Sequence, residues 1–170
     1  MKNITKIIAL AFIVLGFSAS SFAQVTATAI ATATIVTPIA ISKTQDMNFG
    51  NISAGTGGTV TLATDGTRTK SGNVVLPAIG AGSTAAKFTV TGTDTYTYSI
   101  SLPGTITLTN TTDNTKTMSI GTFISTPTTT GVLGTAGQEL LVGAMLTVVG
   151  GQTPGLYTNT TDLTVTVNYN

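Results

Sequence analysis

The chain contains no cysteine, no histidine and no tryptophan, and Glu139 is its only glutamate. Without histidine or cysteine it cannot build a Ser-His-Asp triad, a thiol nucleophile or a zinc site of the usual ligands. The missing cysteines also exclude disulfides, so a folded domain must be held by packing and backbone pairing alone. These absences predict a protein that is not an enzyme and has no catalytic residue, no cofactor and no metal site.

The remaining carboxylates are sparse. Five Asp are scattered along the chain, mostly beside turn residues, as in Asp65-Gly66 and Asp113-Asn114. Two of them could meet as a glycosidase-like dyad, but Asp more often caps its own backbone in a turn. The regular carboxylate spacing of a calcium-binding EF-hand loop is not present. We therefore interpret these Asp as turn residues.

The first 23 residues have the three-part layout of a secretory signal peptide. Lys2 and Lys6 supply a positive start, residues 7–17 form an apolar run, and small residues precede a predicted cleavage between Ala23 and Gln24. The run is shorter than a membrane-spanning helix, and an uncleaved anchor is the alternative. We expect a secreted protein of the bacterial cell surface, extracellular or periplasmic, that meets the membrane only during export.

Cleavage would also change the net charge. The full chain has seven Lys and Arg against six Asp and Glu, so removal of Lys2 and Lys6 leaves five against six and a net charge of −1. No basic patch with interleaved aromatic residues remains that could bind phosphates. We therefore expect no nucleic-acid partner.

After Gln24 the commonest residue is threonine, which favours extended backbone. Apolar residues alternate with Thr or Ser in several runs, the pattern of a half-buried strand. Two such runs, 96–102 and 106–109, flank Pro103-Gly104 and predict a β-hairpin, whereas Leu140–Val149 is apolar on both faces and predicts a central strand. The fold class we predict is all-β, an antiparallel two-sheet immunoglobulin-like sandwich.

The predicted organisation is a signal peptide (1–23), an N-terminal extension (24–37) and one sandwich domain (38–170). Residues 25–36 alternate: the odd positions from Val25 to Ile35 are apolar, and Thr occupies the even positions except Ile30 and Val36. Residues 24–36 are either the first strand of their own sandwich or a donor strand that completes the sheet of a neighbouring copy. The candidate donor-strand residues are Val25, Ala27, Ala29, Ala31, Ala33 and Ile35.

Three stretches together resemble the bacterial domain-of-unknown-function family 4402. They are residues 35–52 (IVTPIAISKTQDMNFGNI), residues 88–103 with FTVTG and YSISLP, and residues 142–170 with VGAMLTV, GLY and LTVTVNYN. The resemblance covers nearly the whole chain after Gln24. It implies a secreted β-sandwich and leaves the activity open.

More distantly, the layout is similar to spore-coat protein U and to chaperone–usher fimbrial subunits. That similarity implies a C-terminal assembly strand, recognised by a periplasmic chaperone, that ends in a penultimate Tyr with a Gly upstream. The matching residues here are Gly155, Leu163, Val165, Val167 and Tyr169. Such proteins often carry a disulfide, which this chain cannot form.

We expect a structural or adhesive surface subunit that self-associates by β-strand addition into fimbria-like or coat-like homopolymers. The alternative is a monomeric module that binds a glycan or a cell-envelope partner, for which Tyr157, beside a turn, is the aromatic residue expected to be exposed. Ice binding by the Thr array of residues 26–34 is a third hypothesis, although β-propensity alone explains exposed Thr.

Overall fold

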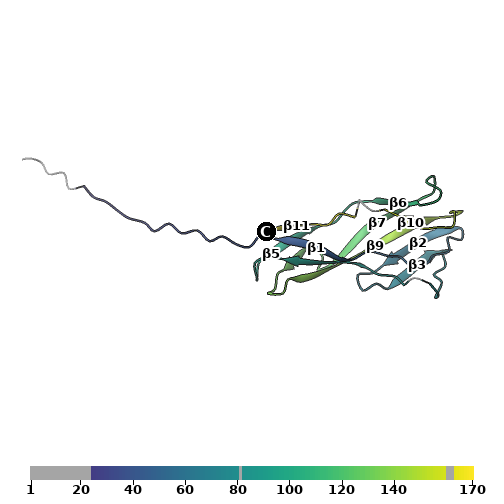
Figure 1. Ribbon diagram of the computed structural model, residues 1–170, viewed down its shortest axis with the longest axis horizontal. Helices are drawn as coiled ribbons and strands as arrows, with labels where there is room; N and C mark the ends of the chain where they lie inside the picture. The colour runs from purple at the N-terminus through teal and green to yellow at the C-terminus, as the bar shows by residue number, and fades with distance from the viewer. Residues whose placement is uncertain (1–23, 81, 160–162) are drawn as a thin grey trace, which may run out of the picture. The chain divides into compact units, whose positions relative to one another are not determined.

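A computed structural model describes residues 24–80, 82–159 and 163–170. The predicted signal peptide, Ala23 included, lies outside these residues. The described residues fall into two units, 24–34 and Ile35–Asn170. The second unit is the folded domain, and it consists of strands and connecting loops (Figure 1). The described residues form no helix that could cross a membrane.

Two antiparallel sheets make up the domain, which confirms the predicted all-β sandwich. In the larger sheet the strand order is β1-β4-β9-β7-β6-β10, with β2 on β9 and β3 on β2; in the smaller sheet it is β11-β5-β8. The strands of the larger sheet are β1 (Ala40–Gln45), β2 (Gly57–Leu62), β3 (Arg68–Gly72), β4 (Ala86–Thr91), β6 (Ile106–Asn110), β7 (Thr117–Thr126), β9 (Gln138–Val149) and β10 (Tyr157–Thr158). The strands of the smaller sheet are β5 (Thr97–Ser101), β8 (Thr130–Val132) and β11 (Thr166–Tyr169).

The central strand is β9, as the apolar stretch Leu140–Val149 predicted. One edge of β9 pairs first with β4 and then with β2, and its other edge pairs with β7. Gly143 lies where β2 ends, and a Cβ atom there would overlap the carbonyl oxygen of Leu62. Glycine is therefore needed at this position because another backbone passes too close for a side chain.

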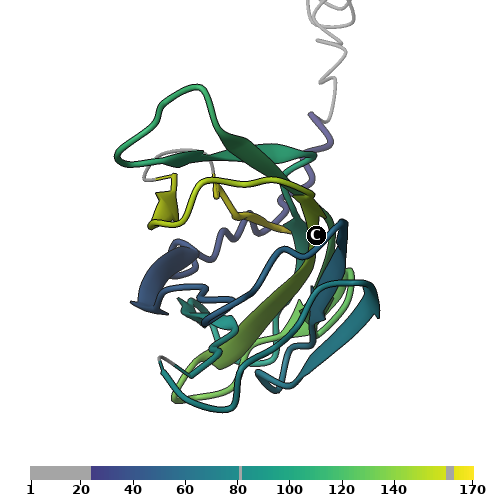
Figure 2. The same cartoon turned by 90° about the vertical axis from the view of Figure 1, so that its right-hand side faces the viewer.

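The core lies between the curved larger sheet and the smaller one (Figure 2). Tyr98 of β5 is fully buried and packs with Leu140 and Val142 of β9 and with Val165 and Val167 near the C-terminus. A second cluster is formed within the larger sheet by residues of β2, β6, β7 and β9, and it includes Leu62, Leu146 and Val148. Each such aliphatic side chain contributes about 1.5–3 kcal/mol on burial, which a disulfide-free domain requires.

The hairpin predicted around Pro103-Gly104 is wrong. β5 lies in the smaller sheet between β11 and β8, whereas β6 lies in the larger sheet between β7 and β10. The chain therefore crosses from one sheet to the other at this turn. Both runs turn their apolar sides inward, Tyr98 to one buried cluster and Ile106 to the other, and strands of two opposed sheets do this as well as the strands of a hairpin.

Two other turns do close hairpins. β2 and β3 are joined at Asp65-Gly66, and β6 and β7 at Asp113-Asn114. The Asp65 carboxylate accepts hydrogen bonds from the amide and the hydroxyl of Thr67, at 2.9 and 2.7 Å. Asp113 binds Thr115 in the same way. These bonds favour the charged form and hold the pKa of both carboxyls below its ordinary value of 3.8, so the Asp residues act as turn caps, as predicted.

Candidate functional site

The N-terminal extension is exposed. Residues 24–34 form no strand, and the side chains of Val25, Ile30 and Ile35 are 92%, 95% and 98% exposed. The first strand of the domain is β1, which begins at Ala40, so in this structure residues 24–36 are not the first strand of the sandwich. The described structure therefore leaves a long, alternating and partly apolar segment uncovered.

The chain immediately before β1 is fastened to the domain by a tyrosine. The hydroxyl of Tyr169 donates a hydrogen bond to the carbonyl of Thr37 at 2.7 Å and accepts one from the amide of Thr93, also at 2.7 Å. The amide of Thr37 in turn donates to the hydroxyl of Thr93. The ring of Tyr169 meets Tyr96 edge to face, with the ring centroids 5.6 Å apart. The predicted C-terminal residue Tyr169 thus holds the base of the extension.

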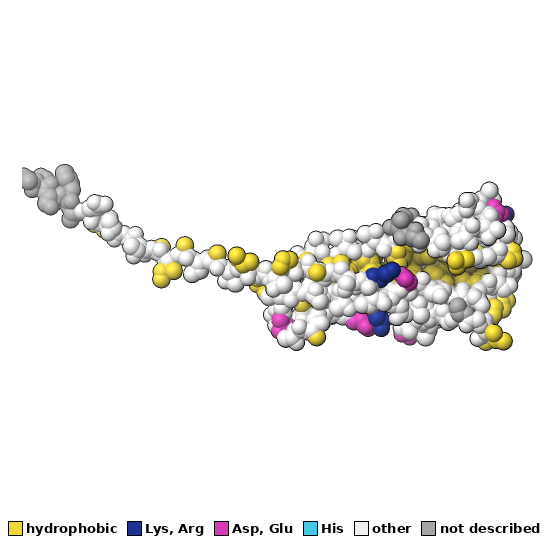
Figure 3. Space-filling view, in the orientation of Figure 1, with side chains coloured by type: hydrophobic (Ala, Val, Ile, Leu, Met, Phe, Trp, Pro, Cys, Tyr) yellow, Lys and Arg dark blue, Asp and Glu magenta, His cyan; other side chains and the backbone are white. Residues whose placement is uncertain are grey.

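A groove of about 900 Å³ opens along the domain beyond the end of β1. Its first wall is the segment Asp46–Gly55, and its second wall is Gly151–Asn159, which contains β10. Its floor is formed by Leu108, Met118, Ile120, Leu146 and Val148. Figure 3 shows hydrophobic side chains as a band between two more polar rims. Leu108 and Met118 are half-buried, so part of this apolar floor faces solvent.

The two walls do not pair with each other. In the first wall, Asn48 and Ser53 bridge to Thr84 and Val75, neither of which belongs to the second wall. In the second wall, β10 is the last strand of its sheet, and among the described residues it pairs with β6 alone. No backbone hydrogen bond joins residues 46–55 to residues 151–158. Among these described residues, the two walls are therefore not paired with each other across the groove.

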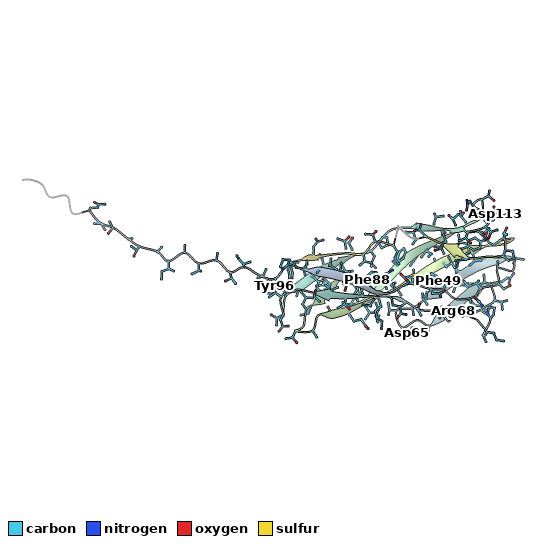
Figure 4. The ribbon with its side chains drawn as sticks, viewed as in Figure 1. Phe49, Asp65, Arg68, Phe88, Tyr96 and Asp113 are labelled. Carbon is cyan, nitrogen blue, oxygen red and sulfur yellow. The ribbon has the colours of Figure 1, made fainter. Side chains whose placement is uncertain are left out.

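Polar side chains hold each wall in place. The guanidinium of Arg68 on β3 donates to the carbonyls of Phe49 and Asn51, at 2.6 and 3.0 Å (Figure 4). On the other side, the fully buried Asn110 donates to the carbonyl of Thr153 at 3.1 Å. The groove is thus built in advance by side chains that bind backbone, rather than by pairing of its walls.

The other predicted C-terminal residues lie in different places. Val165 and Val167 are buried in the domain's own core, and Leu163 packs on both core clusters. Gly155 lies in the second wall of the groove, next to the side chain of Asn110. In the part of the chain that the structure describes, β11 pairs with β5 on one edge and with no strand on the other. Recognition of this strand by a chaperone stays a prediction, and it would have to use the free edge of β11, because the apolar side chains are already covered.

Tyr157 is not the exposed aromatic residue that the sequence suggested. It is half-buried, and its hydroxyl lies 2.9 Å from the Oε1 atom of Gln152 and 2.8 Å from the carbonyl of Thr153. Tyr96 is the more exposed ring, at 43%. In the part of the chain that is described, no three Asp, Glu, His or Cys side chains gather into a group that could hold a metal ion.

Apart from Gly155 and Tyr157, the groove residues were not identified as site residues from the sequence. The alternating pattern placed Met118 and Ile120 on one face, but it could not show that this face would be left partly uncovered. The segment 46–55 carries apolar residues at Met47, Phe49 and Ile52 without regular alternation. That irregularity, between two clear strands, was the only signal of an edge that bridges to its neighbours at isolated points.

No curated protein and no solved structure matches the chain. A family model does match, and it confirms the resemblance seen in the sequence. The model described as "Domain of unknown function (DUF4402)" covers residues 39–169, and the protein belongs to that family.

Proposed function

We propose that this protein is an exported structural or adhesive subunit of the cell surface, which assembles by β-strand addition through residues 25–36. The observation that carries this proposal is the exposure of the extension. A segment that alternates like a strand and carries Val25, Ile30 and Ile35 in solvent lacks the sheet that its pattern requires. Assembly would supply that sheet from another copy and yield a homopolymer.

The energetics favour a partner that pairs with both edges of the extension. Fixing the backbone of one residue costs about 1–2 kcal/mol, whereas one intramolecular hydrogen bond returns only about 1 kcal/mol net. Four of the six apolar positions on the odd face are alanine, so side-chain burial adds modestly at those positions. A strand of this composition gains most where it forms hydrogen bonds on both sides and buries Val25 and Ile35.

Export would follow the predicted signal peptide, and a periplasmic chaperone would keep unpaired edges covered until assembly. Uncovered edges invite irregular aggregation, which secreted proteins must avoid. The extension and the free edge of β11 are the surfaces that such a chaperone would protect.

The test compares the protein that begins at Gln24 with a version lacking residues 24–36, by size-exclusion chromatography and electron microscopy. We expect concentration-dependent polymers from the first protein and monomers from the second. A finer variant carries Ala29→Pro and Ala31→Pro, which removes two backbone donors without shortening the chain. It should also stay monomeric, whereas the matched Ala29→Ser and Ala31→Ser control, which keeps both donors, should polymerise.

If the intact protein and the shortened one are equally monomeric and equally stable, strand donation between copies is wrong. A monomeric binding module would then be the better account. Tyr96 would be the first residue to replace in a glycan-binding assay, since its ring is exposed.

A further inference from the structure

We infer that the groove between Asp46–Gly55 and Gly151–Asn159 is the acceptor site, and that residues 25–36 of a second copy are its occupant. This inference rests on the proposed function and adds the surface that receives the strand and the face that the strand presents. The odd-numbered side chains, from Val25 to Ile35, point to the floor, and the Thr residues at even positions point to solvent.

Backbone pairing comes first. The bridging groups of Asn48 and Ser53 in the first wall pair with Thr84 and Val75, which do not line the groove. Among the described residues, β10 pairs with β6 and with no second strand. A strand laid between these walls would find hydrogen-bonding groups on both sides, which is the condition that a strand rich in alanine needs.

The shape of the floor suits small side chains. Leu146, Val148 and Ile120 are already at least 96% buried, so the floor is filled by the domain's own residues and the groove above it is shallow. Alanine at alternate positions lets a strand backbone settle close to such a floor, whereas larger residues throughout would hold it away. Ile30 falls on the opposite face of the incoming strand, and Leu156 of the second wall, 67% exposed, is an apolar neighbour available to cover it.

Chain length favours a second copy over the same chain. The groove begins at Asp46, eleven positions after Ile35. At about 3.3 Å per residue this path is about 36 Å, and residues 24–34, also eleven, extend about 36 Å. An extension that turned back at Ile35 would only just reach the near end of its own groove, given the predicted start at Gln24. In another copy the extension meets no such limit and can run along the whole first wall.

The absence of natural cysteine allows a direct test by disulfide cross-linking in the full chain. One variant carries Met118→Cys in the floor, and a second preparation carries a single cysteine in the extension. The two are mixed, allowed to assemble, oxidised and separated on a non-reducing gel. We expect heterodimers with Ala29→Cys or Ala31→Cys, and at least ten-fold less with Thr28→Cys or Thr32→Cys, because neighbouring positions of a strand face opposite sides.

Two controls keep the result decisive. Thr147→Cys lies on β9 between floor residues but is exposed, on the opposite face of the sheet, and should not cross-link. Leu108→Cys replaces Met118→Cys if that variant folds poorly, since the two residues are direct partners across β6 and β7.

The failures of the two proposals are distinguishable. If the protein polymerises but neither floor cysteine links to the extension, or if Thr147→Cys links equally well, the groove assignment is wrong while strand donation stands. If no polymer forms at all, both proposals fall. Equal linking from Ala and Thr positions would also overturn the proposed facing of the strand.

Discussion

Replacing Asn110 with alanine should weaken the domain and loosen one wall of the groove. Asn110 is fully buried at the end of β6, and its side chain makes three hydrogen bonds to backbone. The Oδ1 atom accepts from the amides of Thr112 and Asp113, at 2.8 and 3.0 Å, and the Nδ2 atom donates to the carbonyl of Thr153 at 3.1 Å. One side chain therefore joins the β6–β7 turn to the second wall.

The expected loss follows from these bonds. A typical hydrogen bond contributes about 1 kcal/mol net, and a buried partner left unsatisfied costs about 1–3 kcal/mol. Three bonds at about 1 kcal/mol each give a loss of about 3 kcal/mol in the free energy of unfolding. The larger cost of unsatisfied buried groups does not apply, because water can reach part of the exposed turn. For a domain of this size about 3 °C of melting temperature corresponds to 1 kcal/mol, so we expect a fall of about 9 °C.

Thermal unfolding followed by circular dichroism, together with the urea midpoint, measures this loss for Asn110→Ala. The matched control is Asn168→Ala, in β11, where the side chain is exposed and the change should stay within about 0.5 kcal/mol. A loss below about 1 kcal/mol for Asn110→Ala would refute the reasoning, since it would mean that the wall is held by other contacts.

Three further variants test other parts of the account. Tyr169→Phe removes the hydroxyl that binds Thr37, so we expect a loss of about 1–2 kcal/mol and faster hydrogen exchange at the base of the extension. Arg68→Met frees two carbonyls of the first wall and should cost about 2 kcal/mol, whereas Lys70→Met, exposed on the same strand, should be near neutral. The pKa of Asp65 is lowered in the fold by the hydrogen bonds that its carboxylate accepts from the hydroxyl and the amide of Thr67. Its stabilising effect is therefore present above pH 3.8 and is lost as the pH falls below it, and Asp65→Asn should flatten this part of an acid-unfolding curve.

Much of the fold could be predicted from local pattern. The run Leu140–Val149 identified the central strand because a strand covered on both faces needs apolar residues at successive positions. Asp65-Gly66 and Asp113-Asn114 identified two turns because Asp and Gly suit tight turns, and the structure shows that both turns close hairpins. Pro103-Gly104 led to a wrong hairpin prediction, because the same turn residues also occur where the chain crosses from one sheet to the other. Hydrophobic periodicity does not show which strands become neighbours.

Of the candidate site, the sequence identified the extension but not the groove. The alternation from Val25 to Ile35 is typical of a strand with one apolar face, and the structure leaves those residues exposed. The groove itself was not predictable, because it exists where two chain segments fail to pair. Such an absence depends on strand order, which brings Asp46–Gly55 opposite β10 although about a hundred residues separate them in the chain.

Hydrogen–deuterium exchange of residues 24–36, in material isolated from cells, tests the central claim most directly. Backbone amides held in a strand ladder exchange slowly, whereas those of a free extension exchange at the rate of an unfolded chain. We predict slow exchange across Val25–Ile35 in the assembled protein, and fast exchange in dilute monomer. Fast exchange of these amides in the assembled material would contradict the account, because the extension would then be covered by no sheet at all.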